Sequence, residues 1–201
     1  MSSADWYRNK TWDKDIEKAF FDKLKRARSQ RDQYLVIQAL TLTDRHPDVS
    51  LRLVDEYFDS RKDKFNDLRG LLARVQAYLT LDKVDDAMEA FRAVLVCEEE
   101  FPNCKSNAYV DYPYIVATRK IEKEYENAIN VLNENVERLA FPVDYFKWFA
   151  AKALILNDGD QASKALEAAQ VKKSGFSFHQ DVGLVGKEYE KTIKQLCKIS
   201  T

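Results

Sequence analysis

Apolar residues recur along this chain at the spacing of amphipathic helices, in pairs of stretches separated by a short polar break. In the clearest pair, residues 68–99, apolar side chains follow one another every three or four positions on both sides of the break. Each stretch has the length of a helix, so the pair predicts a helical hairpin. The residues that mark its two helices are Leu71, Val75, Tyr78, Ala87, Phe91 and Val94.

The same pattern occurs about four times between residues 31 and 170, and a small residue marks the centre of each second helix. These small residues are Ser50, Ala87, Ala128 and Ala162, and they recur after 37, 41 and 34 residues. Two antiparallel helices approach to about 8–10 Å only where the crossing side chains are short. We therefore expect all four to be buried at hairpin crossings. Repeated hairpins of this size stack into solenoids, which predicts an all-α chain of about ten helices.

The segments on either side of the hairpins predict capping helices. In residues 1–30, three aromatic residues precede a helix that is expected from Asp13, a suitable N-cap, to Ser29. Residues 171–201 begin with a glycine-containing loop, for which Phe176 and Phe178 are the expected apolar anchors. A last helix is expected from about Lys187 to Ile199. We expect these two ends to cover the outer hairpins of a single domain spanning residues 1–201.

Residues 31–170 resemble tetratricopeptide repeats. The copy at residues 68–99 matches that family at Leu71, Tyr78, Ala87 and Phe91, with Val75 at a position that is usually small. The resemblance implies a right-handed α-α superhelix, a solenoid of about four hairpins with a capping helix at each end.

The third copy departs most from this family. Arg119 stands where an aromatic residue is usual, and Pro113 falls inside the expected first helix. Because proline removes a backbone donor and clashes with the preceding turn, we expect this helix to start late, near Tyr112 or Pro113.

In tetratricopeptide proteins the first helix of each hairpin lines a concave groove that binds partners. Two tyrosines of the third copy are further candidates, because tyrosine contributes contact area at low entropic cost, although packing between repeats is an alternative explanation. Ala151 stands where a clamp for a peptide's terminal carboxylate would need asparagine, so we do not expect such a clamp. The candidate partner-binding residues are Arg69, Leu72, Gln76, Leu79, Tyr109, Tyr114 and Lys147.

Composition indicates a folded protein that can bury a core of its own. The chain has 201 residues, 45% of them apolar, which suits a continuous core without disulfides or metal. The net charge is −1, which does not favour binding to nucleic acid or to an anionic membrane. We expect a module that binds a protein or peptide, such as an adaptor or a toxin-neutralising immunity protein of a bacterial cytoplasm. The alternative is an RNA-binding or regulatory repeat protein, supported only by the basic run Lys23–Arg31, which also reads as a solvated helix face.

Residues that carry chemistry are scattered. The two histidines, His46 and His179, are isolated, no metal-ligand spacing occurs, and there is no glycine-rich phosphate loop. We therefore expect no enzyme, no cofactor and no metal. Three widely spaced cysteines are typical of a reduced, cytoplasmic protein, and the chain shows neither a secretory signal nor an apolar run of about 20 residues.

Overall fold

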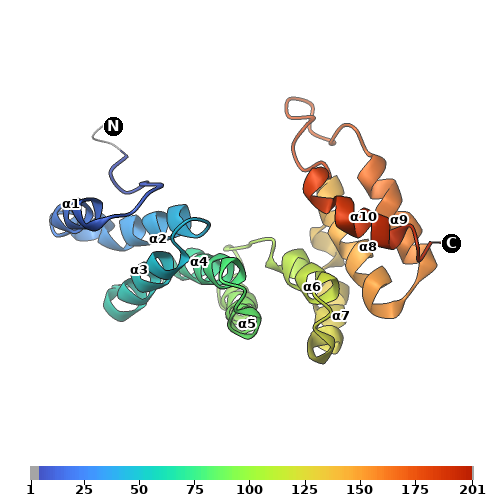
Figure 1. The fold of residues 1–201 in the computed structure, drawn as a ribbon, viewed down its shortest axis with the longest axis horizontal. Coiled ribbons are helices and arrows are strands. Elements are labelled where there is room, and N and C mark those ends of the chain that lie inside the picture. The colour runs from blue at the N-terminus through green and yellow to red at the C-terminus, as the bar shows by residue number, and fades with distance from the viewer. Residues whose placement is uncertain (1–4, 201) are drawn as a thin grey trace. The chain divides into compact units, whose positions relative to one another are not determined.

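The computed structural model describes residues 5–200, and these residues form ten α-helices joined by loops and short 3-10 turns (Figure 1). The all-α prediction is confirmed. The chain forms two compact units, one ending at Ser106 and the other beginning at Asn107. Residues 1–4 and Thr201, the outermost parts of the two expected capping segments, lie outside the described residues.

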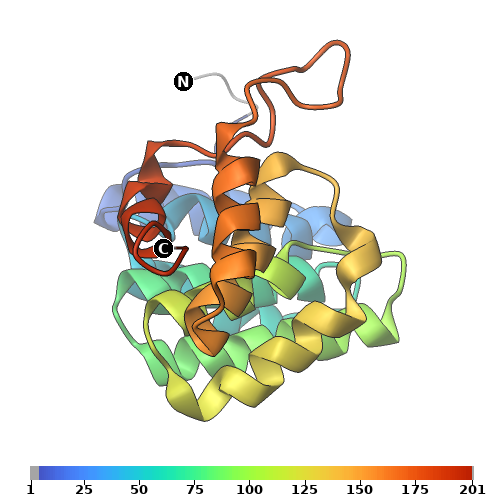
Figure 2. The same cartoon turned by 90° about the vertical axis from the view of Figure 1, so that its right-hand side faces the viewer.

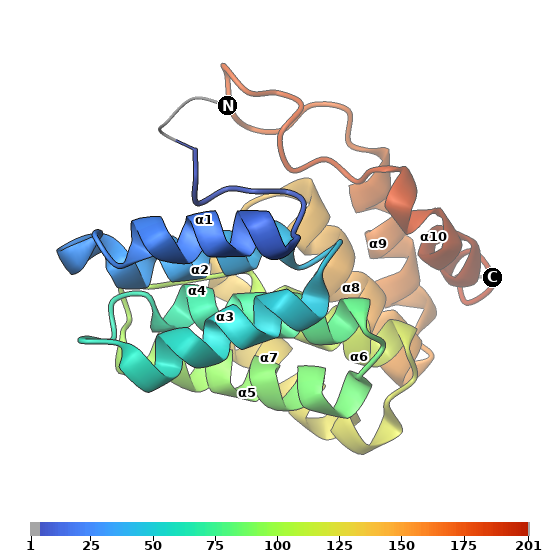
Figure 3. The same ribbon diagram turned by 60° about the vertical axis from the view of Figure 1, so that its left-hand side comes forward.

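Five helices form the first unit, and consecutive helices pack against each other. The contacts of α2 with α3, of α3 with α4 and of α4 with α5 are extensive, and α2 also contacts α4 (Figure 3). The hairpins expected at residues 31–61 and 68–99 are therefore present. The helices are α1 (Lys14–Leu24), α2 (Arg31–Leu42), α3 (Pro47–Ser60), α4 (Asp67–Thr80) and α5 (Val84–Glu100).

Helix α1 begins as the sequence predicts but ends early. The Asp13 carboxylate accepts hydrogen bonds from the backbone N–H groups of Asp15 and Ile16, at 2.9 and 2.8 Å, and so acts as the N-cap. The helix ends at Leu24, so the expectation that it reaches Ser29 was wrong. A separate 3-10 turn, Arg28–Gln30, follows, and Arg28 at its start has a φ of 40°, outside the α-helical region.

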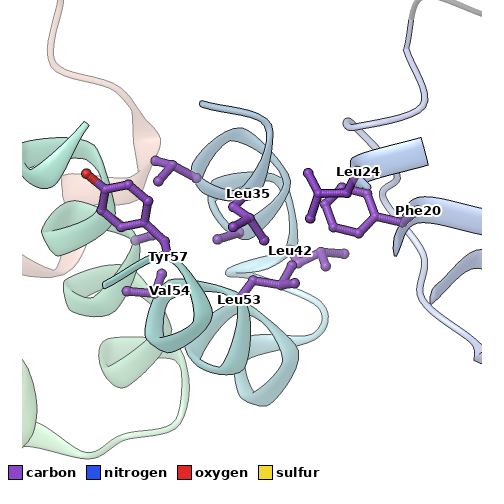
Figure 4. Close-up of a cluster of buried hydrophobic side chains, with 10 residues drawn as sticks. Phe20, Leu24, Leu35, Leu42, Leu53, Val54 and Tyr57 are labelled. Atoms are coloured by element: carbon purple, nitrogen blue, oxygen red, sulfur yellow. The ribbon is translucent and has the colours of Figure 1, made fainter. Parts of the chain in front are cut away.

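The core of the first unit joins α1, α2 and α3 through large apolar side chains (Figure 4). Phe20 and Leu24 of α1 are buried against α2, so α1 covers the outer face of the first hairpin. Burying one such side chain contributes about 1.5–3 kcal/mol. The labelled members of this cluster in Figure 4 are Phe20, Leu24, Leu35, Leu42, Leu53, Val54 and Tyr57.

The second unit also has five helices, with α8 and α9 forming its most extensive pair and α6 packing on both α7 and α8 (Figure 2). Its last helix, shorter than expected, contributes the buried residues Thr192 and Leu196, and Leu196 packs with residues of α8 and α9. The helices are α6 (Ala108–Thr118), α7 (Tyr125–Glu134), α8 (Pro142–Leu156), α9 (Gly159–Gln170) and α10 (Glu190–Leu196).

The small residues at the hairpin crossings are buried as predicted. All four are 0% exposed, and each lies on the second helix of its hairpin. Alanines from both helices lie in the core between α8 and α9, because Ala150 and Ala153 of α8 pack with Ala162 and Ala165 of α9. Short side chains at these positions let the two helix backbones lie close together.

Pro113 does not delay the start of α6. The helix begins at Ala108, and the Asn107 carbonyl accepts hydrogen bonds from the N–H groups of Val110 and Asp111, at 3.0 and 2.9 Å. The expectation of a start near Tyr112 was therefore wrong. An interior proline costs about 3 kcal/mol in an isolated helix. Here Pro113 is itself buried, and the packing of α6 against α7 and α8 offsets that cost.

No helix among the described residues is long and apolar enough to cross a membrane.

Candidate functional site

Helix α4 carries four of the predicted partner-binding residues on one face, because their spacing of three or four residues repeats once per helical turn. Arg69 and Gln76 are exposed to solvent, and Leu72 and Leu79 are partly buried. The Arg69 guanidinium lies 3.5 Å from the amide oxygen of Asn66. This face is therefore a mixed polar and apolar surface of the first unit.

Lys147, the predicted residue on α8, has a structural partner. Its Nζ donates a hydrogen bond to the Asp111 carboxylate on α6 at 2.6 Å, and its side chain is only 15% exposed. Burial lowers the pKa of Lys147, but the Asp111 carboxylate and Tyr189 together raise it above its ordinary value. The lysine is therefore charged and joins α8 to α6.

Tyr109 and Tyr114 hold the second unit together. Tyr109 is 3% exposed, its hydroxyl donates to the Arg138 carbonyl at 2.9 Å, and burial raises its pKa to about 12. The Arg138 guanidinium lies 4.1 Å from the centre of the same ring. The Tyr114 hydroxyl shares a hydrogen bond of 2.6 Å with the Thr192 hydroxyl of α10. These contacts give both tyrosines the packing role that the sequence offered as an alternative.

A groove in the second unit was not anticipated from the sequence. It has a volume of about 490 Å³ and lies between the beginning of α8 and the end of α9. Its lining is mainly apolar, and we call it the α8/α9 groove. The lining residues are Ala140, Pro142, Tyr145, Phe149, Lys164, Glu167, Ala168, Val171, Lys173 and Gly175.

The groove exists because a small residue on α9 lies opposite large residues on α8. Ala168 lines one side, and Tyr145 and Phe149 line the other. Tyr145 and Val171 remain substantially exposed, so apolar surface is open to solvent here. Contiguous exposed apolar surface of this kind is typical of sites that bind other molecules.

The loop after α9, residues 171–186, is tied to the start of α8 by specific contacts. The Phe141 and Phe176 rings stack with their centres 5.1 Å apart. The Gly183 carbonyl accepts a hydrogen bond from the Val143 N–H at 2.8 Å. Gly183 has a φ of 73°, and a Cβ there would lie 2.3 Å from the Phe141 ring, so only glycine fits.

The tip of this loop holds Phe178 in solvent, 94% exposed. Ser174 closes the loop, because its N–H donates to the Gln180 carbonyl at 2.7 Å and its hydroxyl donates to the His179 carbonyl at 2.8 Å. Phe176 stacks on Phe141 as an anchor, although its side chain is 48% exposed, whereas the expectation that Phe178 is an anchor was wrong. The sequence of the loop does not tell which of the two aromatic residues makes this contact.

The residues that line the groove carry a net positive charge. Lys164 and Lys173 line it, Lys172 is the preceding residue in the chain, and Glu167 is the one acidic residue of the lining. Among the described residues neither Lys164 nor Lys173 forms an ion pair, and the Lys164 Nζ lies 5.8 Å from the Phe149 ring centre. The groove therefore combines an apolar floor with a cationic rim.

The basic run Lys23–Arg31 is partly neutralised by acidic neighbours. Lys25 pairs with Asp22 at 3.3 Å, and Arg31 pairs with Glu56 of α3. This pairing weakens the electrostatic basis of the RNA-binding alternative.

The described residues contain no group of three or more histidine, cysteine or acidic side chains that could hold a metal ion. The cysteines Cys97, Cys104 and Cys197 are all free thiols. None of the protein-family models, curated proteins or solved structures compared with the chain matches it.

Proposed function

We propose that this protein is a binding module that holds a segment of a partner polypeptide in the α8/α9 groove. The observation that carries the proposal is the apolar groove beside an ordered loop that exposes Phe178. A volume of about 490 Å³ lies within the range of roughly 300–1,000 Å³ that is usual for ligand pockets. It has room for bulky side chains of a bound segment.

Phe178 supplies a second contact for the same partner. An aromatic side chain buries roughly 150–250 Å² when it is covered. Covering the exposed Phe178 ring would therefore add a large apolar contact to the free energy of binding. The hydrogen bonds of Ser174 and the Phe141–Phe176 stack reduce the conformational freedom that the loop loses on binding.

The rim of the groove indicates the chemistry of the partner. Lys164, Lys172 and Lys173 favour acidic residues next to the apolar residues that enter the groove. The partner segment is therefore amphipathic, with aliphatic or aromatic side chains flanked by Asp or Glu.

Two narrower predictions from the sequence, the type of repeat and the biological role, are part of this proposal. The resemblance to tetratricopeptide repeats, with a right-handed superhelix, supports a binding role, because that family uses helical hairpins to hold partners. An adaptor or a toxin-neutralising immunity protein is a role in which a chain without evident catalytic chemistry acts by binding alone.

Selection of displayed random 16-residue peptides on the full chain tests the proposal. We expect enriched peptides to be acidic and apolar, and Val171→Glu to weaken their binding at least tenfold, about 1.4 kcal/mol, by fluorescence anisotropy. Val136→Glu is the matched control, because Val136 is also an exposed valine of the second unit but does not line the groove. We expect the control to change affinity less than twofold.

A second variant, Phe178→Ser, tests the loop separately and should also weaken binding. Peptides that bind equally to the parent, V171E and F178S would place recognition elsewhere on the chain. Salt-dependent binding of an RNA oligonucleotide at a comparable affinity would favour the RNA-binding alternative.

A further inference from the structure

The first unit contains a different kind of pocket, which the proposed function does not use. It has a volume of about 440 Å³ and is formed by the N-terminal segment, α2 and α4. We call it the arginine pocket. Its lining residues are Arg8, Gln33, Ile37, Leu40, Thr41 and Arg69.

The backbone that carries Arg8 is fixed to α2 by a buried glutamine. Gln38 is 0% exposed, its amide oxygen accepts from the Asn9 N–H at 2.9 Å, and its amide nitrogen donates to the Asn9 carbonyl at 2.8 Å. The rings of Tyr7 and Tyr34 stack on the other side of Arg8, with centres 4.4 Å apart. A polar side chain buried in this way holds the segment in one register, and it keeps Arg8 at the pocket.

Neither arginine of the pocket has an acidic partner among the described residues. The Arg8 guanidinium lies 5.5 Å from the Tyr7 ring centre, and that of Arg69 approaches only the neutral Asn66 amide. No carboxylate is found among the described residues that line the pocket. Other arginines of the same unit do pair with carboxylates. These pairs are Arg31 with Glu56, Arg52 with Glu17, Arg61 with Asp67, and Arg74 with Asp55.

We infer that the arginine pocket binds a phosphate monoester whose organic part is apolar. Two guanidinium groups without counter-charges match the two negative charges of a phosphate monoester at neutral pH, and guanidinium binds phosphate oxygens in a bidentate manner. Ile37 and Leu40 provide an aliphatic wall for the organic part. The Gln33 amide is a further hydrogen-bonding group within the lining.

This inference is independent of the α8/α9 groove, because it uses residues of the other unit only. Either one can fail while the other holds. The same phosphate chemistry occurs in a phosphorylated side chain of a polypeptide and in a small phosphate ester, and the experiment separates these sources.

The test is a titration of the full chain with phenyl phosphate at pH 7.5 and about 150 mM salt, where long-range electrostatics are screened. Arginine Nε–Hε resonances of Arg8 and Arg69 are followed by NMR. Benzoate offers the same ring with a single charge, and inorganic phosphate offers the charge without the ring. We expect saturable shifts at both arginines, with phenyl phosphate binding at least fivefold more tightly than either comparison compound.

The double variant Arg8→Gln with Arg69→Gln should weaken phenyl phosphate binding at least tenfold. The matched control is Arg26→Gln with Arg45→Gln, which removes two exposed arginines of the same unit that do not line the pocket. Equal loss in both double variants would show non-specific attraction and overturn the inference. So would benzoate binding as tightly as phenyl phosphate, or shifts that do not saturate.

A short peptide, Gly-Leu-phosphoserine-Leu-Gly, separates the two sources. Tighter binding of this peptide than of phenyl phosphate assigns the pocket to a phosphorylated polypeptide. The reverse order assigns it to a small phosphate ester. If neither compound binds, the inference is wrong.

Discussion

The two compact units pack helical hairpins with different side chains. In the first unit, leucine, valine and aromatic residues of α1, α2 and α3 fill the core. In the second, alanines of α8 and α9 are buried together with Phe146, while Tyr145 and Phe149 line the groove beside this contact. The comparison shows that a close alanine contact leaves its large neighbours partly uncovered, which is how the α8/α9 groove arises. The arginine pocket of the first unit is more polar, because two arginines, Gln33 and Thr41 contribute to its lining.

Both units nevertheless use the same polar device at the joint between helices. The Tyr57 hydroxyl donates to the Asp67 carboxylate at 2.7 Å, across the junction of α3 and α4. The Tyr112 hydroxyl donates to the Glu124 carboxylate at 2.9 Å, which ties α6 to the turn before α7. Each buried carboxylate is thereby hydrogen-bonded, as buried charge requires.

The largest expected effect is on the small residues at the crossings. Ala128→Arg forces a long, charged side chain into a fully buried contact and should lower the free energy of unfolding by about 4 kcal/mol. Ala87→Arg should do the same in the first unit. Urea unfolding followed by circular dichroism measures both. Asn130→Arg, at an exposed position of the same helix as Ala128, should change stability by less than about 0.5 kcal/mol. An unchanged transition for A128R would show that α7 is not packed as described.

A smaller effect separates two positions that the sequence treated as equivalent. Lys147→Glu places a second carboxylate against Asp111 in a largely buried site and should cost about 3 kcal/mol. Arg69→Glu, at an exposed position without an ion pair among the described residues, should cost less than about 0.5 kcal/mol. Thermal unfolding of the two single variants makes the comparison. The double variant Lys147→Glu with Asp111→Lys reverses the pair and should recover part of the loss. Equal stability of K147E and R69E would contradict a structural role for this pair.

The smallest expected effect concerns the buried tyrosine hydroxyls. Tyr57→Phe removes one donor from Asp67, which keeps its ion pair with Arg61 at 2.9 Å, so we expect a loss of about 1 kcal/mol. Tyr112→Phe removes one donor from the buried Glu124 carboxylate in the same way, so we expect a loss of about 1 kcal/mol there too. Chemical denaturation measures both losses. No loss in either variant would show that the tyrosine hydroxyls do not stabilise these joints.

Much of the helical pattern could be predicted, and the exceptions have physical causes. The hairpins and their small residues follow from periodicity, because one buried face per helix imposes its spacing on the sequence. The early end of α1 and the early start of α6 depend on backbone angles and on packing around Arg28 and Pro113, which periodicity does not report. The cost of a proline inside α6 was outweighed by the packing of this helix against its neighbours.

The candidate sites were less predictable than the fold. Arg69 is exposed as expected and lines the arginine pocket, but Arg8 comes from a segment far away in the chain and reaches that pocket through Gln38. From the sequence, Lys147 was expected to be a free surface lysine, because its partner Asp111 lies on another hairpin. Pairing across hairpins is a property of the folded chain, and no spacing along one helix shows it.

The sequence by itself determined the helices, their pairing into hairpins and the small residues at their crossings, because each is set by side chains within a few helical turns. Only the tertiary structure decided which charges are paired, which tyrosines are buried and which of two phenylalanines in one loop stacks on Phe141. Those outcomes depend on contacts between segments far apart along the chain. Such contacts decide which of two nearby side chains is covered and which stays exposed. The groove and the arginine pocket belong to this second class.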